Sequence, residues 1–61
     1  MSFKAERQKA DKTVQEVMKY MNVTDAAVYQ WETGVTTPRP DKLLKLADFY
    51  GCTMEDLLRG N

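Results

Sequence analysis

The sequence predicts an all-α fold of five short helices, on the evidence of its length, its composition and its helix-capping residues. The 61 residues include only three glycines and two prolines, while 43% are apolar and 30% are charged. These values are typical of a small helical globular domain. Because a chain this short builds a marginal core, regular helix packing or a partner must supply stability. We expect a single domain over residues 1–61.

Capping residues and apolar spacing predict the first two helices. Ser2 is the expected N-cap of a helix over residues 3–10, which is rich in good helix formers. Thr13 and Glu16 have the spacing of a capping box, so a second helix starts at this threonine. Apolar residues then recur at intervals of three and four, which places them on one core-facing side. They are Val14, Val17, Met18 and Met21.

The third helix lies between a tight turn and a proline-containing loop. Asn22 tolerates the left-handed conformation that turns the chain, Thr24 caps the next helix and Gly34 ends it. Residues 35–39 form a loop, and Pro40 fits the first turn of the following helix. The apolar side of the third helix is Ala27, Val28 and Trp31, and we expect this tryptophan in the core.

Two more helices complete the chain. The fourth carries apolar residues at i, i+3, i+4 and i+7, and Gly51 ends it. A last short helix, capped within residues 53–56, carries Leu57 and Leu58. The apolar residues of the fourth helix are Leu43, Leu46, Ala47 and Tyr50.

Several classes of function find no support in the residues. The chain has no histidine and one cysteine, so it forms no internal disulfide and no Cys/His zinc site. Cys52 has no base beside it and no glycine-rich phosphate loop is present, so we expect no enzyme, cofactor, metal or small-molecule ligand. We interpret Cys52 as a small buried hydrophobe in preference to a redox switch. With no long apolar stretch and no signal pattern, we expect a cytoplasmic protein without membrane contact.

Charge is balanced overall but unevenly distributed. The chain has nine Lys and Arg residues and nine Asp and Glu residues. Nucleic-acid-binding proteins usually have a surplus of basic residues. Residues 1–20 hold five basic and three acidic side chains, so the local surplus lies there.

The strongest signal is the pair of helices over about residues 14–33. Only residues 22–24 separate them, which forces a wide crossing angle and predicts a helix-turn-helix. Two further segments are Val-Tyr-Gln-Trp-Glu-Thr-Gly at 28–34 and Leu-Leu-Lys-Leu-Ala-Asp at 43–48, with Pro38 between them. With residues 13–18 and 23–24, these motifs resemble the phage repressor and Cro family, also called XRE-type. This resemblance implies a five-helix lambda-repressor-like domain and a bacterial or phage regulator, expected to be a repressor, that binds double-stranded DNA.

The resemblance also implies which side chains face the bases. The helix over residues 25–33 would enter the major groove, where Gln30 can pair with adenine and Asp25 can accept from cytosine. Asp25 has a second interpretation, as an anion at the helix N-terminus. Tyr29 is either partly buried or a phosphate contact. The expected base-reading residues are Asp25, Ala26, Ala27, Tyr29 and Gln30.

The phosphate contacts depart from the family pattern. Val14 stands where the family has glutamine, and the usually basic loop reads Val35-Thr36-Thr37, so we expect modest affinity and a shallow salt dependence. Met18 replaces a small residue and is expected to widen the helix crossing slightly. The expected backbone-contacting residues are Lys12, Gln15, Lys19, Thr36, Thr37 and Arg39.

Two other expectations concern structure and assembly. Arg7 and Glu32 match a charged pair that ties the first helix to the third in this family. Met54 and Leu58 match the region of two-fold dimers, which predicts a homodimer on a palindromic operator. Met54, like Met18 and Met21, can also be a gap-filler in the core. The alternative function is a protein-interaction module, antitoxin-like or antirepressor-like, with little DNA affinity.

Overall fold

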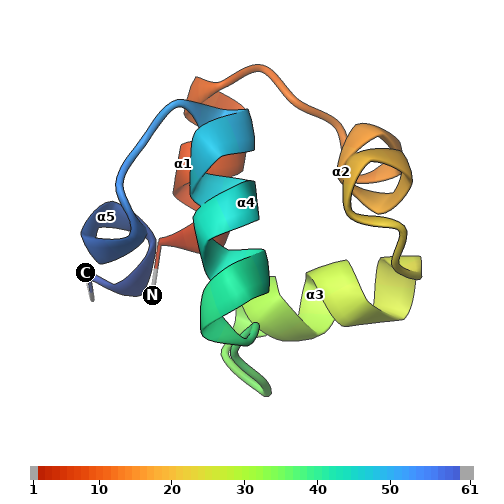
Figure 1. Ribbon diagram of the computed structural model, residues 1–61. Helices are drawn as coiled ribbons and strands as arrows, with labels where there is room; N and C mark the ends of the chain where they lie inside the picture. Colours follow the sequence, from red (N-terminus) through yellow and green to blue (C-terminus); the bar gives the residue numbers. More distant parts are fainter. Residues whose placement is uncertain (1, 60–61) are drawn as a thin grey trace.

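Five helices surround one core in the computed structural model, which describes residues 2–59. They are α1 (Phe3–Lys9), α2 (Val14–Met21), α3 (Asp25–Thr33), α4 (Pro40–Tyr50) and α5 (Met54–Leu58). The described residues contain no strand, so the predicted all-α class is confirmed. In Figure 1, α1 and α4 lie at the centre, α5 lies on one side, and α2 and α3 lie on the other side and below.

Each helix contributes one of the largest fully buried side chains. Val17, Val28 and Leu46 come from positions predicted to face the core, whereas Phe3 and Leu57 were predicted only as parts of their helices. Burying a large apolar side chain stabilises a fold by roughly 1.5–3 kcal/mol, so no helix is dispensable to this core. The five residues are Phe3, Val17, Val28, Leu46 and Leu57.

The predicted helix ends are largely confirmed. Thr13 Oγ1 accepts from the Glu16 amide at 3.1 Å, while the Glu16 carboxylate accepts from the Thr13 amide at 2.8 Å. Asn22 and Gly34 adopt left-handed conformations, with φ of 56° and 81°. Thr53 and Asp56 form a second reciprocal capping box at the start of α5.

The start and end of α1 differ from the prediction. Ser2 lies at the N-cap position, but its side chain makes no capping hydrogen bond to the helix. Its hydroxyl instead donates to the Arg59 carbonyl at 2.7 Å, and its amide donates to the Leu57 carbonyl at 3.0 Å. The helix ends at Lys9, one residue early, because Asp11 takes a left-handed φ of 57° and turns the chain toward α2. Ser2 therefore joins the two ends of the described chain.

A surface column of aromatic rings and lysines links α2 to α4. The rings of Tyr20 and Phe49 stack with centroids 4.1 Å apart. Lys12 Nζ lies 4.8 Å from the centroid of the Phe49 ring, and Lys45 Nζ lies 5.3 Å from that of Tyr20. Such stacked and cation–π contacts each contribute about 0.5–1.5 kcal/mol. No sequence pattern predicted this contact, since the two rings lie on different helices.

The single cysteine packs against the core as expected. Cys52 is partly buried beside the helix α4 that precedes it. Burial raises the pKa of its thiol, with smaller contributions from the carboxylates of Glu6 and Asp56. A thiol in these surroundings is less often ionised than a free one, which agrees with a packing role.

Candidate nucleic-acid interface

Helices α2 and α3 form the predicted helix-turn-helix. Figure 1 shows α2 along its axis while α3 lies across the page, so the two helices cross at a wide angle. The turn between them is short because Asn22 reverses the chain and Thr24 caps α3, accepting from the Ala27 amide at 3.3 Å. This arrangement exposes one long side of α3 and places its other side on the core.

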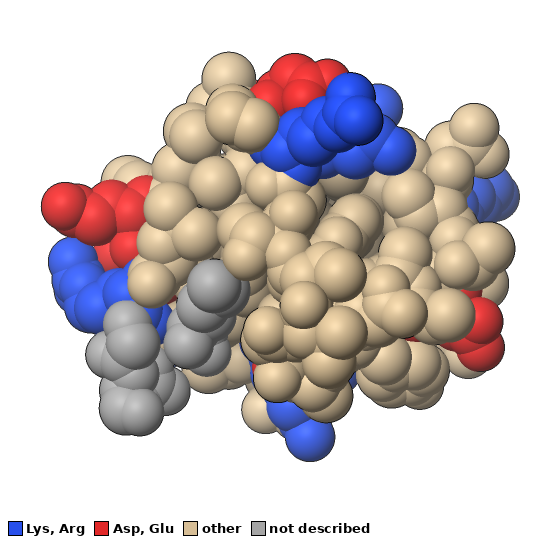
Figure 2. Space-filling view, turned by 90° about the horizontal axis from the view of Figure 1, so that it is seen from below, with Lys and Arg blue, Asp and Glu red and all other residues tan. Residues whose placement is uncertain are grey.

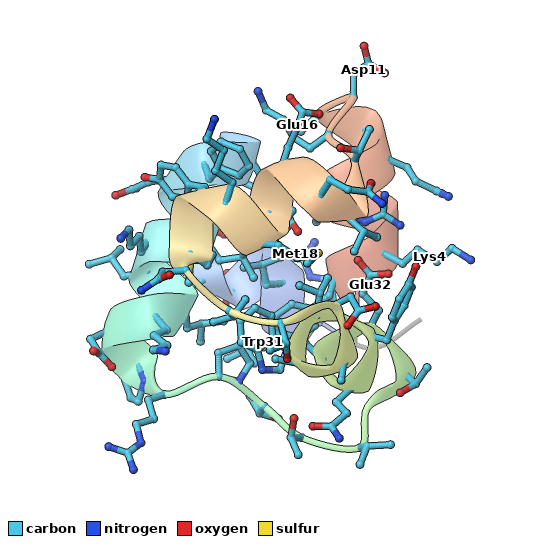
Figure 3. All side chains as sticks on the ribbon, turned by 90° about the vertical axis from the view of Figure 1, so that its right-hand side faces the viewer. Lys4, Asp11, Glu16, Met18, Trp31 and Glu32 are labelled. Carbon is cyan, nitrogen blue, oxygen red and sulfur yellow. The ribbon has the colours of Figure 1, made fainter. Side chains whose placement is uncertain are left out.

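The inward side of α3 is held by apolar packing. Val28 and Trp31 are buried, with 1% and 7% of their surfaces exposed, and Ala27 packs partly against the same core. Met18 is partly buried and lies between α2 and α3 (Figure 3). These contacts fix the rotation of α3 about its axis, and so determine which residues face outward.

A partly buried ion pair joins α1 to the last turn of α3. Arg7 Nε donates to Glu32 Oε2 at 2.6 Å, and a second guanidinium nitrogen donates to Glu32 Oε1 at 3.3 Å. The two side chains are 12% and 5% exposed, and Figure 3 shows Glu32 directed from α3 toward α1. The remaining guanidinium nitrogen donates to the Lys12 carbonyl at 3.0 Å, in the turn before α2. Arg7 thus holds α1, the turn before α2, and α3 in one geometry.

The electrostatics of this junction favour the charged form of Arg7. The hydrogen bond to Glu32 raises the pKa of Arg7 against the opposing effect of burial. Tyr50 lies nearby on α4, and burial above all, with the Glu32 charge second, raises the pKa of its phenol. The phenol therefore stays neutral and the arginine stays charged across the physiological pH range.

The outward side of α3 carries the residues predicted to read bases. Asp25, Ala26, Tyr29 and Gln30 are exposed, whereas Ala27 is only partly exposed. Half of the Tyr29 surface, 51%, is accessible to solvent. Asp25 Oδ1 accepts from the Ala26 amide at 2.8 Å, so this carboxylate is already engaged at the N-terminus of α3. Tyr29 and Gln30 are therefore large polar side chains that stay exposed on α3.

The residues predicted to contact the DNA backbone lie on α2 and on the two loops. Gln15, Lys19, Thr36, Thr37 and Arg39 are exposed, whereas Lys12 is partly buried with its ammonium over the Phe49 ring. Figure 2 shows that the surface over α3 and the loop to α4 is largely uncharged, with Lys, Arg, Asp and Glu gathered at its margins. The outward face therefore offers hydrogen bonds and apolar contact more than charge.

The predicted dimer residues differ in exposure. Leu58 is 43% exposed on α5, whereas Met54 packs partly against the core.

Within residues 2–59, no group of three or more His, Cys, Asp and Glu side chains could hold a metal ion. In that same stretch, none of the helices is long and apolar enough to cross a membrane.

Comparison with protein families identifies the chain. The family model described as helix-turn-helix matches residues 3–57, which covers all of α1 to α4 and α5 except its last residue. No match was found among curated proteins or among solved structures. The matched span includes the capped turn, the inward Trp31 and the Arg7–Glu32 junction. The chain belongs to the XRE-type helix-turn-helix family and is a DNA-binding domain of a transcriptional regulator.

Proposed function

We propose that the protein is a sequence-specific repressor that occupies a DNA operator by inserting α3 into the major groove. The observation that carries this proposal is the outward face of α3, where Gln30 is exposed while the opposite face is fixed by Trp31 and the Arg7–Glu32 pair. The major groove accommodates one α-helix, and its base edges present a distinct pattern for each base pair. A protein acting on DNA in this way needs no catalytic group or cofactor, and works in the cytoplasm.

Gln30 is the proposed centre of base reading. Its amide can donate to N7 and accept from the N6 amino group of one adenine, a bidentate contact that discriminates by about 1–3 kcal/mol. Ala26 and the exposed part of Ala27 offer methyl groups near the start of α3, while Asp25 and Tyr29 flank them. The exposed residues Gln15, Lys19, Thr36, Thr37 and Arg39, together with Lys12, are the proposed phosphate contacts.

A homodimer on a palindromic operator accompanies this function. The exposed side chain of Leu58, with Met54 behind it, is the proposed contact between the two copies. A second copy would add to the core of a 61-residue chain. Two-fold symmetry would place two half-sites about 34 Å apart, one turn of DNA.

Selection from random duplexes tests the proposal. The full chain is expected to enrich a palindromic motif at low salt, and Gln30→Ala is expected to lose about 1–3 kcal/mol and to relax selection at one adenine per half-site. Thr33→Ser is a matched control on the same helix, because the Thr33 hydroxyl already donates to the Tyr29 carbonyl at 2.8 Å. An unchanged motif with Gln30→Ala would refute the assigned base contact.

One observation favours a second function. The uncharged outward face and the zero net charge would also suit a protein-interaction module with little affinity for DNA. Titration with a nonspecific duplex separates the two functions, because every DNA-binding protein retains a salt-sensitive electrostatic component. Absence of binding to any duplex at low salt would favour the interaction module.

A further inference from the structure

Val35 is an apolar side chain in an exposed position, outside the core. It begins the loop between α3 and α4 and is 70% exposed, more than any other large apolar side chain in the described part of the chain. Its branched Cβ leaves few rotamers, so the isopropyl group keeps nearly one position relative to the backbone. A rigid apolar group on a loop surface is a candidate for recognition, since loops carry contacts positioned by a scaffold.

The backbone at Val35 is tied to the helix that faces the DNA. The Val35 amide donates to the Gln30 carbonyl at 2.9 Å, and the Thr36 amide donates to the same carbonyl at 3.3 Å. Pro38 is buried and anchors the far side of the loop. Two hydrogen bonds therefore hold the start of the loop, with Val35, against the backbone of Gln30, the residue proposed to read adenine.

The residues next to Val35 in the chain are uncharged. Thr36 and Thr37 follow it, and the hydroxyl of Thr33 is turned back onto the Tyr29 carbonyl. Figure 2 shows no Lys or Arg at the centre of the surface over α3 and the loop to α4. An isopropyl group cannot bind a phosphate, whereas the C5-methyl of thymine is the apolar group that a base edge presents in the major groove.

We propose that Val35 reads the C5-methyl group of a pyrimidine next to the base pair contacted by Gln30. The inference rests on the proposed DNA-binding function and adds a specificity-determining residue to it. In unmodified DNA this pyrimidine is thymine, and 5-methylcytosine carries the same methyl group. The loop would then contribute to base selection, and affinity for the site would respond to a single methyl group.

Removing the methyl group from the DNA and the isopropyl group from the protein tests this inference. After the motif has been selected, each thymine is replaced in turn by deoxyuridine, which lacks only the C5-methyl. The wild-type chain is expected to lose affinity about three- to fivefold at one thymine per half-site, the effect of one buried methyl group. Val35→Ala is expected to bind the thymine and deoxyuridine duplexes equally at that position. In the wild type, 5-methylcytosine there is expected to bind better than cytosine by the same factor.

Controls keep the outcomes distinct. Leu44→Ala removes another exposed apolar side chain, from α4 and outside the proposed interface, and should retain the thymine preference. Val35→Ala should melt at the wild-type temperature because the side chain is exposed. A preference for thymine over deoxyuridine that is equal in the wild type and Val35→Ala, or absent from both, overturns the inference but leaves DNA binding intact. Failure to select any duplex overturns the proposed function and this inference with it.

Discussion

The two sides of α3 use opposite chemistry. The inward side ends in a carboxylate, Glu32, which is 5% exposed and paired with Arg7 at 2.6 Å. The outward side exposes Tyr29 and Gln30 and continues into the uncharged residues that start at Val35. The Arg7–Glu32 ion pair therefore fixes the position of α3 from its inward side. The outward side of α3 presents hydrogen-bonding and apolar groups instead.

This contrast explains why zero net charge is compatible with a DNA-binding family. Charges that are paired inside the protein do not contribute to its external field, and Arg7 and Glu32 cancel there. Other basic side chains, such as Lys19 and Arg39, are exposed. The small number of proposed phosphate contacts predicts a shallow salt dependence.

The largest expected effect comes from breaking the inward junction. Glu32→Gln leaves the partly buried Arg7 charge without its partner, which should destabilise the fold by about 2–3 kcal/mol, at or below the lower end of the range for fully buried pairs. Urea denaturation followed by circular dichroism measures this loss. Lys9→Gln serves as the control, because the Lys9–Glu6 pair at 3.4 Å is exposed and should contribute about 0.5 kcal/mol or less. Equal losses in the two variants would show that the junction is no stronger than a surface pair.

A smaller effect is expected where the inward and outward sides meet. Gly34 has a φ of 81°, and a Cβ added at this position would meet no other atom, so Gly34→Ala strains only the backbone. The cost should be about 1–2 kcal/mol, the penalty for a left-handed alanine. Thermal melting measures it, and Gly34→Asn should recover part of the loss because asparagine tolerates this conformation. A neutral Gly34→Ala would mean that the loop carrying Val35 is not held in its observed conformation.

The smallest expected effect is on the pH dependence of stability. The Thr13 amide lowers the pKa of Glu16, and the Thr53 amide lowers that of Asp56. A carboxylate with a lowered pKa in the folded state stabilises the fold above its unfolded pKa and loses that effect as the pH falls through its folded pKa. The melting temperature should therefore fall as the pH drops through and below the ordinary carboxylate pKa values, 4.5 for Glu16 and 3.8 for Asp56.

Glu16→Gln tests this interpretation with little change in shape. The amide oxygen can still accept from the Thr13 amide but does not titrate, so the variant should show a shallower fall in melting temperature on acidification. The Thr53–Asp56 box remains in this variant and should account for part of the residual slope. An identical slope in the wild type and Glu16→Gln would contradict the assignment.

Most of the fold could be predicted from the sequence because its signals are local. Capping boxes, left-handed residues and apolar spacing depend on neighbours within a few positions, and the ends of α2, α3 and α4 lie where these signals place them. The family resemblance also depends on short runs of sequence, such as the one that holds Trp31, Glu32 and Gly34. The family match covers residues 3–57. The exception at Ser2 arose because a distant carbonyl, that of Arg59, competes for its hydroxyl.

Contacts between distant residues depend on the tertiary structure. Only the fold brings Phe49 against Tyr20, turns Lys12 toward a ring, and gives Arg7 the Lys12 carbonyl as well as Glu32. The same packing separates Leu58, which is exposed, from Met54, which lies partly in the core. The helices and the family follow from the sequence without the fold, because they depend on short-range chemistry. Which side chains face outward is set by packing between helices, because burial depends on the rotation of each helix against the whole core.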